Sequence, residues 1–293
     1  MFLFRGAMQK LLFVSIFSLA TLMFSQSIYA KKKTPAPKIP SVTKKVQKEN
    51  VEPDEELKKA LAGLNSLDPD EVIESIQIIG ASANPLATTP LIDLLKTGPR
   101  SDITDSILFA LGSIINDDAV PIIIDYTKHR RPDTRIAALL ALENKKSDDV
   151  TRAAERGLRD SDRQVRATAA AVLGTRRDSA SIPILFAAFE RDVSEAAIAI
   201  GKTGNEDDSK RLLGYLGKKD IKVLLAGFEE FLKRDSFAES AKLNILNRLF
   251  DLAGPEVWRF AVNLKATFPP EATEENNNVL KLVNRMVRQI KDK

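Results

Sequence analysis

The chain has 293 residues, of which 44% are apolar and only 6% aromatic, with no cysteine and a single histidine. The absence of cysteine excludes a disulfide framework, a thiolate metal site and a cysteine nucleophile. The one histidine, His129, lies in the solvated basic run KHRR, which leaves neither a serine-type catalytic triad nor a histidine zinc site.

The apolar content comes mainly from alanine, leucine and isoleucine, which suit close packing of helices better than the faces of sheets. The net charge of +4 divides unevenly along the chain, because residues 1–30 carry +2, residues 31–53 carry +5 and residues 54–293 carry −3. The body of the protein is therefore acidic, and the basic pI of the whole chain is no evidence for specific nucleic-acid binding.

The first predicted element is a signal peptide over residues 1–30. Its apolar core, LLFVSIFSLATLMF at residues 11–24, follows a basic start and is shorter than the roughly 20 apolar residues of a membrane span. We therefore expect a periplasmic or secreted protein, with an uncleaved membrane anchor as the alternative. Met8 is an alternative to Met1 as the true start, because the segment after it forms a compact signal by itself.

A tether is predicted over residues 31–53, where seven lysines and four prolines stand among few apolar residues. Such a composition cannot bury enough apolar surface to fold, so we expect an extended, disordered spacer. The alternative is that its lysines contact an anionic membrane or cell-wall surface, at about 1 kcal/mol for each lysine.

Helical repeats are predicted over residues 54–219, because two sets of residues recur at nearly the same period. The first set ends an apolar run and consists of Gly80, Gly112, Glu143, Gly174 and Gly201, at intervals of 32, 31, 31 and 27. The second set follows about ten residues later and consists of Pro90, Pro121, Arg152, Pro183 and Arg211. A shared period of this length indicates stacked repeats.

Each repeat is predicted to contain two helices. We expect the glycine to end the first helix in a left-handed turn, and the proline to lie in the first turn of the second helix, where it loses no hydrogen bond. A single pair cannot bury its own apolar stripe, so the pairs must stack. An amphipathic helix at residues 54–66 and a C-terminal helical repeat or cap region at residues 220–293 are expected to close the ends.

Residues 161–192, SDRQVRATAAAVLGTRRDSASIPILFAAFERD, resemble the short HEAT-like repeat of bacterial proteins of the phycobilisome-lyase type, with its start D-x-x-V-R-x-x-A-A-x-x-L-G. Residues 99–130 are similar to the same repeat. The resemblance implies an all-α fold, an α-solenoid of about five to six stacked HEAT-like helix pairs with a helical C-terminal cap. It does not imply lyase chemistry, because that activity is not a property of the repeat.

No motif in the chain predicts catalysis. Gly201-Lys202-Thr203 resembles the end of a phosphate-binding loop, but Ala196 stands where that loop requires its first glycine, and no strand precedes it. Acidic pairs before the second helices are placed to cap helix N-termini rather than to act as catalytic carboxylates. We therefore expect a protein that is not an enzyme and that has no cofactor and no metal site.

One charged region is a candidate binding site, because residues 128–177 contain thirteen Lys and Arg against seven Asp and Glu. Helical spacing places Arg152, Arg156 and Arg159 away from the apolar stripe of a second helix. The resemblance implies that second helices line the concave surface, which puts these arginines in the groove. The predicted ridge for an acidic partner consists of Lys128, Arg130, Arg131, Arg152, Arg156 and Arg159, and a solvated charged face is the alternative.

The sequence therefore predicts a non-enzymatic, monomeric scaffold in the bacterial envelope that binds a protein through the concave face of the solenoid. Two other functions are open: binding of an anionic envelope polymer or lipid surface through the tether and ridge, and an accessory role to a lyase-type enzyme. By the same resemblance, Arg135 and Arg166 are expected to pair with acidic residues of adjoining repeats and so to be structural.

Overall fold

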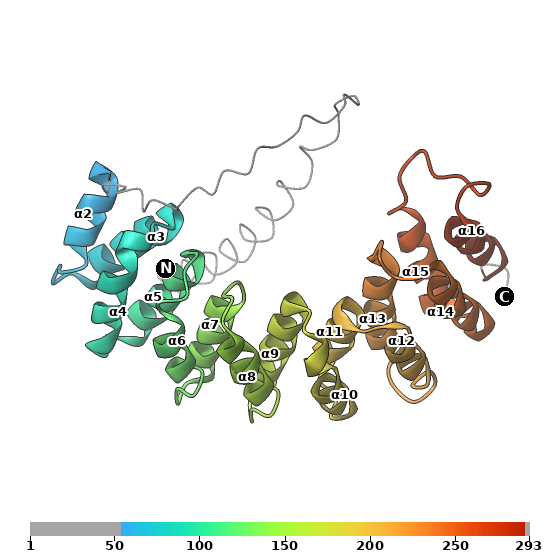
Figure 1. The fold of residues 1–293 in the computed structure, drawn as a ribbon, viewed down its shortest axis with the longest axis horizontal. Coiled ribbons are helices and arrows are strands. Elements are labelled where there is room, and N and C mark those ends of the chain that lie inside the picture. The colour runs from blue at the N-terminus through green and yellow to red at the C-terminus, as the bar shows by residue number, and fades with distance from the viewer. Residues whose placement is uncertain (1–53, 291–293) are drawn as a thin grey trace, which may run out of the picture. The chain divides into compact units, whose positions relative to one another are not determined.

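The structure is a computed structural model that describes residues 54–290, so the predicted signal peptide and tether lie outside the described residues. Residues 54–290 form fifteen α-helices and two short 3-10 helices, and they contain no strand (Figure 1). The predicted all-α solenoid is confirmed.

After α2 (Glu55–Gly63), the helices alternate between two layers. The first helices of the successive pairs are α3 (Pro69–Ser82), α5 (Ser101–Ser113), α7 (Pro132–Leu142), α9 (Arg163–Arg176), α11 (Glu195–Thr203), α13 (Ile221–Lys233) and α15 (Pro255–Lys265). The second helices are α4 (Thr88–Lys96), α6 (Val120–Tyr126), α8 (Asp148–Gly157), α10 (Ile182–Glu190), α12 (Glu206–Leu213), α14 (Glu239–Leu252) and α16 (Asn278–Ile290). The 3-10 helices η1 (Pro85–Ala87) and η2 (Ser179–Ser181) precede α4 and α10, and the C-terminal region thus forms two pairs of its own.

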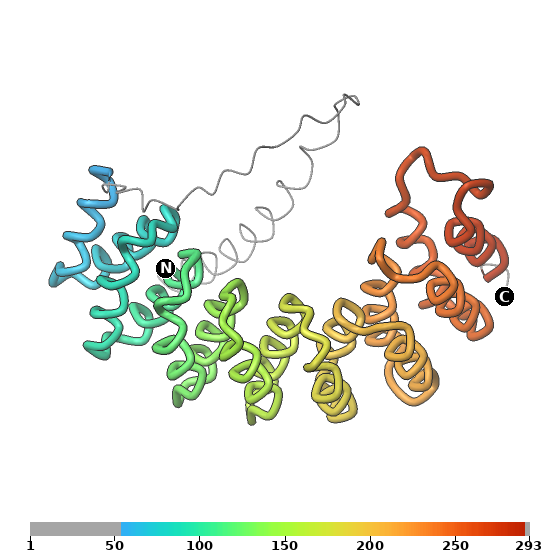
Figure 2. Tube along the Cα trace, in the orientation of Figure 1, coloured from blue at the N-terminus to red at the C-terminus, as the bar shows by residue number. Residues whose placement is uncertain are grey.

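The two layers are packed differently. Each first helix from α3 to α11 packs directly on the next first helix, whereas α8, α10 and α12 of the second layer make few contacts with one another. Figure 2 shows the row of pairs in residues 54–290 bending so that the first helices lie on the inner side and the second helices on the outer side. The first-helix layer is therefore both the denser layer and the concave one.

The recurring glycines lie inside first helices and do not end them. None of the four has a positive φ. A β-carbon added at Gly112 would lie 2.8 Å from the Cα of Ala141, and one added at Gly201 would lie 2.1 Å from the carbonyl oxygen of Gly227. The prediction of left-handed helix ends at these positions is wrong, because glycine recurs where the next first helix passes too close for a side chain.

The helix ends are formed by other residues. Ala83 after α3 and Arg177 after α9 adopt the left-handed conformation, with φ of 49° and 52°. The predicted proline positions are confirmed, since Pro121 and Pro183 lie in the first turns of α6 and α10. The sequence period is therefore correct, and only the physical role of its glycine column changes.

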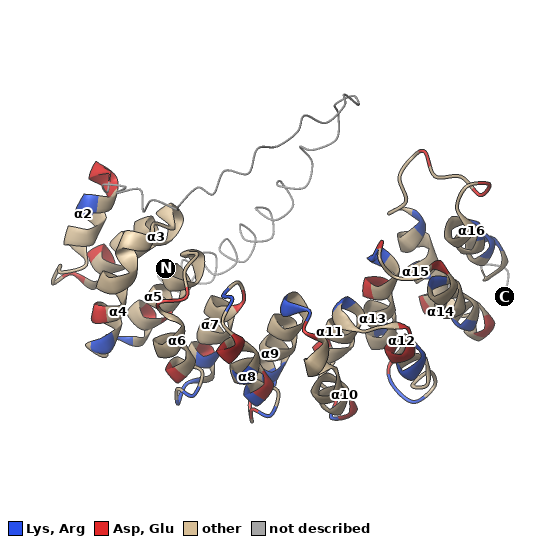
Figure 3. Cartoon of the chain, in the orientation of Figure 1, with Lys and Arg blue, Asp and Glu red and all other residues tan. Residues whose placement is uncertain are grey.

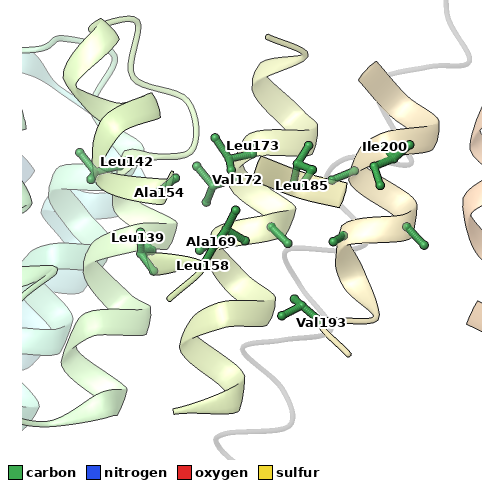
Figure 4. Close-up of a cluster of buried hydrophobic side chains, with 14 of the residues drawn as sticks. Leu139, Leu142, Ala154, Leu158, Ala169, Val172, Leu173, Leu185, Val193 and Ile200 are labelled. Carbon is green, nitrogen blue, oxygen red and sulfur yellow. The ribbon is translucent and has the colours of Figure 1, made fainter. Parts of the chain in front are cut away.

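A core of buried aliphatic side chains runs between the two layers. Figure 4 shows part of it, in which Leu142 of α7, Leu158, Leu173 of α9 and Leu185 of α10 are labelled. Each of these four side chains is 0% exposed. Because every pair shares its core with its neighbours, the stability of the stack is approximately a sum of local and nearest-neighbour contributions.

Cationic side chains fasten the ends of first helices to the next repeat. The buried Nζ of Lys145 donates hydrogen bonds to two carbonyl oxygens at the end of α5, one of them that of Leu111 at 2.7 Å. Arg234 donates to the carbonyl oxygens of Gly201 and Gly204, at 3.1 and 2.6 Å. Desolvation lowers the pKa of both cations. A helix end leaves carbonyl groups unsatisfied and favours positive charge, so these cations are structural.

Candidate interaction surface

The structure does not join the predicted ridge into one surface. Its members divide between the turn from α6 to α7, which holds Lys128, Arg130 and Arg131, the outer helix α8, which holds Arg152 and Arg156, and the turn after α8, which holds Arg159. Ion pairs neutralise three of them, namely Lys128 with Asp125 at 3.7 Å, Arg131 with Asp105 at 3.8 Å, and Arg152 with Asp149. Among residues 54–290, the other three form no ion pair and are exposed.

The expectation that Arg152, Arg156 and Arg159 line the concave surface is wrong. Arg152 and Arg156 lie on α8 and Arg159 lies in the turn after it, and α8 belongs to the second layer, on the outer side of the bend (Figure 1). The physical reason is the close approach of glycine and alanine backbones in the first layer, which brings those helices nearer together than the bulkier second helices. The role of the three arginines in binding stays a prediction, but any such site is on the outer face.

Of the two arginines expected to be structural, one forms the predicted ion pair. Arg135 donates to both carboxylate oxygens of Asp160 in the next repeat, at 2.6 and 2.8 Å. Burial raises the pKa of Asp160, but Arg135 and the amide of Asp162 outweigh burial and hold that pKa below its usual value. Arg166 instead donates to the carbonyl oxygens of Asp160 and Ser161, and no acidic side chain in the described part of the chain pairs with it.

The inner face has a feature that the sequence reasoning missed. The later parts of five consecutive first helices contain no Asp, Glu, Lys or Arg at all, over residues 75–82, 106–113, 136–142, 167–175 and 196–201. We call these five stretches the uncharged band. Figure 3 shows α3, α5 and α9 tan over most of their length, whereas α8 and α12 carry blue and red along theirs. Most residues of the band are buried, and its few exposed positions, which include Phe109, Leu140 and Ala171, carry no charge. Exposed positions of a helix that meets only water are usually polar or charged.

Large apolar side chains are exposed within the uncharged band. Phe109 of α5 is 48% exposed and Leu140 of α7 is 53% exposed, and the two are 31 residues apart, one repeat period. The equivalent position holds Ile78 in α3, which is partly buried. We call Ile78, Phe109 and Leu140 the apolar row. The signal was present in the sequence, because these residues lie between buried positions of each helix and contradict its amphipathic pattern.

An acidic row runs parallel to the apolar row. It consists of Glu71, Asp102 and Asp133, each exposed and each seven residues before a member of the apolar row. Seven residues are two helical turns, or about 10 Å along a helix, so each acid shares a face with its apolar counterpart. Arg100 pairs with Asp102 at 2.5 Å, and Arg131 lies 3.8 Å from Asp133. Glu71 has no ion pair within residues 54–290 and accepts a hydrogen bond from Ser66.

Two members of the acidic row, Glu71 and Asp102, lie in a strongly acidic part of the molecule, whereas Asp133 lies in the basic part that follows. Residues 54–126 contain thirteen Asp and Glu against four Lys and Arg, a net charge of −9. Residues 128–177 have the opposite excess, thirteen basic against seven acidic side chains, and residues 178–293 balance at eighteen of each. The larger, acidic excess was not predicted from the sequence, although it becomes visible when the net charge is divided by repeat.

A shallow hollow lies at the N-terminal end of the apolar row, where Ile78 lines it. It has a volume of about 380 Å³ and lies between α2 and α3, where Leu57, Ile78 and Ala81 form its apolar part. Asp54 and Glu56 add carboxylates at its margin. The hollow therefore combines the same two chemical characters as the rows, apolar contact and negative charge.

Within residues 54–290 the structure contains neither a cluster of metal ligands nor a phosphate-binding loop at Gly201-Lys202-Thr203. No three His, Asp or Glu side chains within residues 54–290 are grouped so as to hold a metal ion. Gly201, Lys202 and Thr203, which resemble part of a phosphate loop, lie inside α11 and follow a helical turn. Among the described helices, none has the length and apolar character needed to cross a bilayer.

Comparison with known proteins concerns the repeats. A model of HEAT repeats matches residues 120–195 and 151–233. The complex of CpcE and CpcF of phycocyanin lyase from Nostoc sp. PCC7120 is similar in structure, with 18% identity, a TM-score of 0.46, and coverage of 88% of this chain and 100% of that chain. A designed armadillo repeat protein has 12% identity, a TM-score of 0.36, and coverage of 80% and 99%. No curated protein matches the sequence.

The family assignment rests on the repeat period, the paired helices and the matched residues together. The match to HEAT repeats spans α6 to α13, and the same alternation of first and second helices continues on both sides of it. Residues 120–233 are therefore HEAT-like repeats, in a chain whose described helices from α3 onward all follow the same paired arrangement.

Proposed function

We propose that this HEAT-like protein is a non-enzymatic interaction scaffold of the bacterial envelope, which binds a partner protein on the exposed face of its first helices. The observation that carries the proposal is the uncharged band with its apolar row. A solvated helix face normally carries charge, and a contiguous uncharged face with exposed aromatic and aliphatic side chains is typical of a surface that another protein covers.

Rigidity supports the same function. The first helices are held at close range by glycine and alanine contacts, such as those of Gly112 with Ala141 and of Gly174 with Ala199. A surface that is already ordered loses little conformational entropy when a partner binds, so more of the contact energy appears as affinity. In the second layer, α8 and α12 carry charged side chains along their length, whereas α10 is uncharged from Ile182 to Phe189.

A pair of matched substitutions tests the binding face. We expect Leu140→Asp to reduce partner retention by tagged protein from crosslinked envelopes at least tenfold, because a carboxylate would be buried against an apolar partner surface. Leu252→Asp is the control, since Leu252 is similarly exposed, at 48%, but lies at the end of the second-layer helix α14. Equal retention by the two variants and the unmodified protein would refute the proposed face.

The envelope location rests on the apolar core at residues 11–24 and on the lysines that follow it. Export predicts a mature N-terminus at or near Lys31, which mass spectrometry of the envelope fraction reads directly. Recovery of peptides from residues 8–30 in the membrane pellet would instead identify an uncleaved anchor. Contact of residues 31–53 with an anionic surface stays a prediction of the lysine content.

A further inference from the structure

Two parallel rows of opposite character cross the first three helix pairs. The apolar row lies on α3, α5 and α7, and the acidic row crosses the same helices about 10 Å away. Stacked helices lie about 8–10 Å apart, so each row spans roughly 20 Å. A surface of this kind is itself amphipathic, with an apolar side and a negatively charged side.

The rows end at the fourth pair. In the fourth pair, Gln164 occupies the position of the acidic row and Ala171 that of the apolar row. In the fifth pair, Arg191 occupies the acidic position and Ile198 the apolar one. The net charge changes sign one pair earlier, from −9 over residues 54–126 to +6 over residues 128–177, so Asp133 of α7 is an acid within a basic part of the chain. The amphipathic surface therefore has a defined length of three repeats.

Charge complementarity selects the occupant. A partner segment that covered the apolar row with its own apolar residues would hold its flank against three carboxylates, and an acidic flank there would be repelled. Arg100 and Arg131 neutralise part of this charge, but the acidic side chains of residues 54–126 outnumber the basic ones by nine. A basic flank is therefore favoured.

The separation of the rows fits a helix. An α-helix with its side chains is about 10–12 Å across, so a helix lying along the apolar row would bring residues of its neighbouring face over the acidic row. The hollow between α2 and α3 would receive one long side chain at the end of such a helix. Lysine and arginine suit it, because their aliphatic stems contact Leu57 and Ile78 while the charge stays near Asp54 and Glu56.

We infer that the inner face of the first three pairs binds a basic amphipathic helix of a partner protein. The inference rests on the proposed scaffold function and specifies the chemistry of the segment that the scaffold holds. It differs from the predicted ridge in both place and sign, since the ridge lies on the outer helix and in the turns of the third pair and was expected to hold an acidic protein.

The test uses the full-length protein and a synthetic amphipathic peptide of leucine and lysine, about 18 residues long, which as a helix extends about 27 Å. Its controls are a peptide with glutamate at every lysine position and a scrambled leucine–lysine peptide. We expect the leucine–lysine helix to bind at least tenfold more tightly than either control, and its affinity to fall with added salt.

Two triple variants separate the acidic row from general negative charge. E71Q/D102N/D133N neutralises the row, and D148N/E206Q/E239Q neutralises three acids of the same helical position, the first turn, in second helices. We expect the first variant to weaken binding of the leucine–lysine peptide about tenfold and the second by less than twofold. Equal losses in the two variants, or tighter binding of the glutamate peptide, would overturn the inference.

A second copy of the chain is the alternative occupant, and sedimentation velocity distinguishes it. Concentration-dependent dimerisation that E71Q/D102N/D133N abolishes would show that the face binds this chain itself and would overturn the inference.

The experiments also distinguish a wrong inference about the basic helix from a wrong proposal of the scaffold function. If the peptide does not bind but Leu140→Asp still loses the native partner, the scaffold function stands and the basic helix is wrong.

Discussion

The first three helix pairs and the two that follow share one backbone plan but differ in what they expose. In both regions the buried positions are filled alike, as Leu108, Leu139 and Leu173 show with exposures of 0 to 1%. The row positions change from acidic and apolar in α3, α5 and α7 to polar and small in α9, where they hold Gln164 and Ala171. In the fifth pair the position of the acid holds Arg191. These exposed positions change while the fold stays the same, so the fold does not determine which residues occupy them. We therefore infer that the difference in exposed residues reflects what each region binds.

The packing of the first-helix layer also differs along the stack, and substitution of its glycines by alanine should show the largest effects. The added methyl of Gly201→Ala would meet the Gly227 carbonyl oxygen at 2.1 Å, and we expect a loss of about 3 kcal/mol in unfolding free energy. At Gly80 the nearest atom is 3.3 Å away, and the better helix propensity of alanine offsets part of the crowding. Gly80→Ala should therefore stay within about 1 kcal/mol of the unmodified protein.

Chemical denaturation followed by circular dichroism measures this contrast. Because the stack is held by nearest-neighbour contacts, Gly201→Ala should also separate the unfolding transition into two steps, with the region before α11 retained longer. Equal stability losses for Gly80→Ala and Gly201→Ala would mean that the layer is packed uniformly.

The ion pair between Arg135 and Asp160 joins α7 of the third helix pair to the start of the fourth, and its removal should have the next largest effect. Arg135→Ala leaves a half-buried carboxylate without its cation, which we expect to cost about 2 kcal/mol at neutral pH. The folded pKa of Asp160 is below its unfolded value, so its contribution is complete above about pH 4 and is lost as pH falls through the folded pKa.

Thermal melts between pH 7 and pH 2.5 check both parts of this expectation. The unmodified protein and Asp160→Asn should differ at pH 7 and converge in acid, since the protonated carboxyl no longer gains from Arg135. A difference that is the same at every pH would show that the stabilisation at this site is not ionic.

Extension of the two rows into the fourth pair is a smaller, constructive test. Q164E/A171L places an acid and an apolar side chain at the next positions of the rows, both of which are exposed in the present structure. We expect the leucine–lysine peptide to bind about threefold to tenfold more tightly, with an unchanged melting temperature. The single variants Q164E and A171L separate the effect of the charge from that of the apolar contact. If neither single variant nor the double variant binds the peptide more tightly, the rows are not the binding surface.

Reversing the charge of the three ridge arginines that form no ion pair within residues 54–290 should have the smallest effect. Arg130→Glu, Arg156→Glu and Arg159→Glu together change exposed side chains that form no ion pair within residues 54–290. We expect a change in melting temperature of at most about 2 °C and unchanged partner retention, because the site proposed lies on the other layer. Loss of the partner in this variant would restore the basic ridge as the binding site.

Much of the fold was readable from the sequence. The period of about 31 residues, the prolines of the second helices and the apolar stripe of α2 predicted the paired helices and their stacking, because these signals are local or periodic. The role of the glycines could not be predicted from the sequence. A glycine near the end of a helix has the same sequence neighbours whether it ends that helix or lets another helix pack closely against it. Gly112 shows the second role only when Ala141 is in place beside it.

The candidate surface was harder to predict for a related reason. Which layer is concave depends on the distances between helices far apart in sequence, so Arg152 and Arg156 were assigned to the wrong side. Leu140 was placed among apolar residues of a buried helix, and only its exposure of 53% distinguishes it from the core. The repeat alignment held the missing information, because Leu140 and Phe109 share a column whose neighbours, Asp133 and Asp102, are acidic.

Site-specific photo-crosslinking in cells tests the central claim most directly. A photoreactive amino acid replaces Leu140 on the inner layer in one protein and Arg156 on the outer layer in another, and both positions are exposed. We predict a discrete crosslinked product from position 140 and none from position 156, and mass spectrometry of that product should map the partner's contact to a helix with lysine or arginine beside its apolar face. A product from position 156 alone would contradict the account.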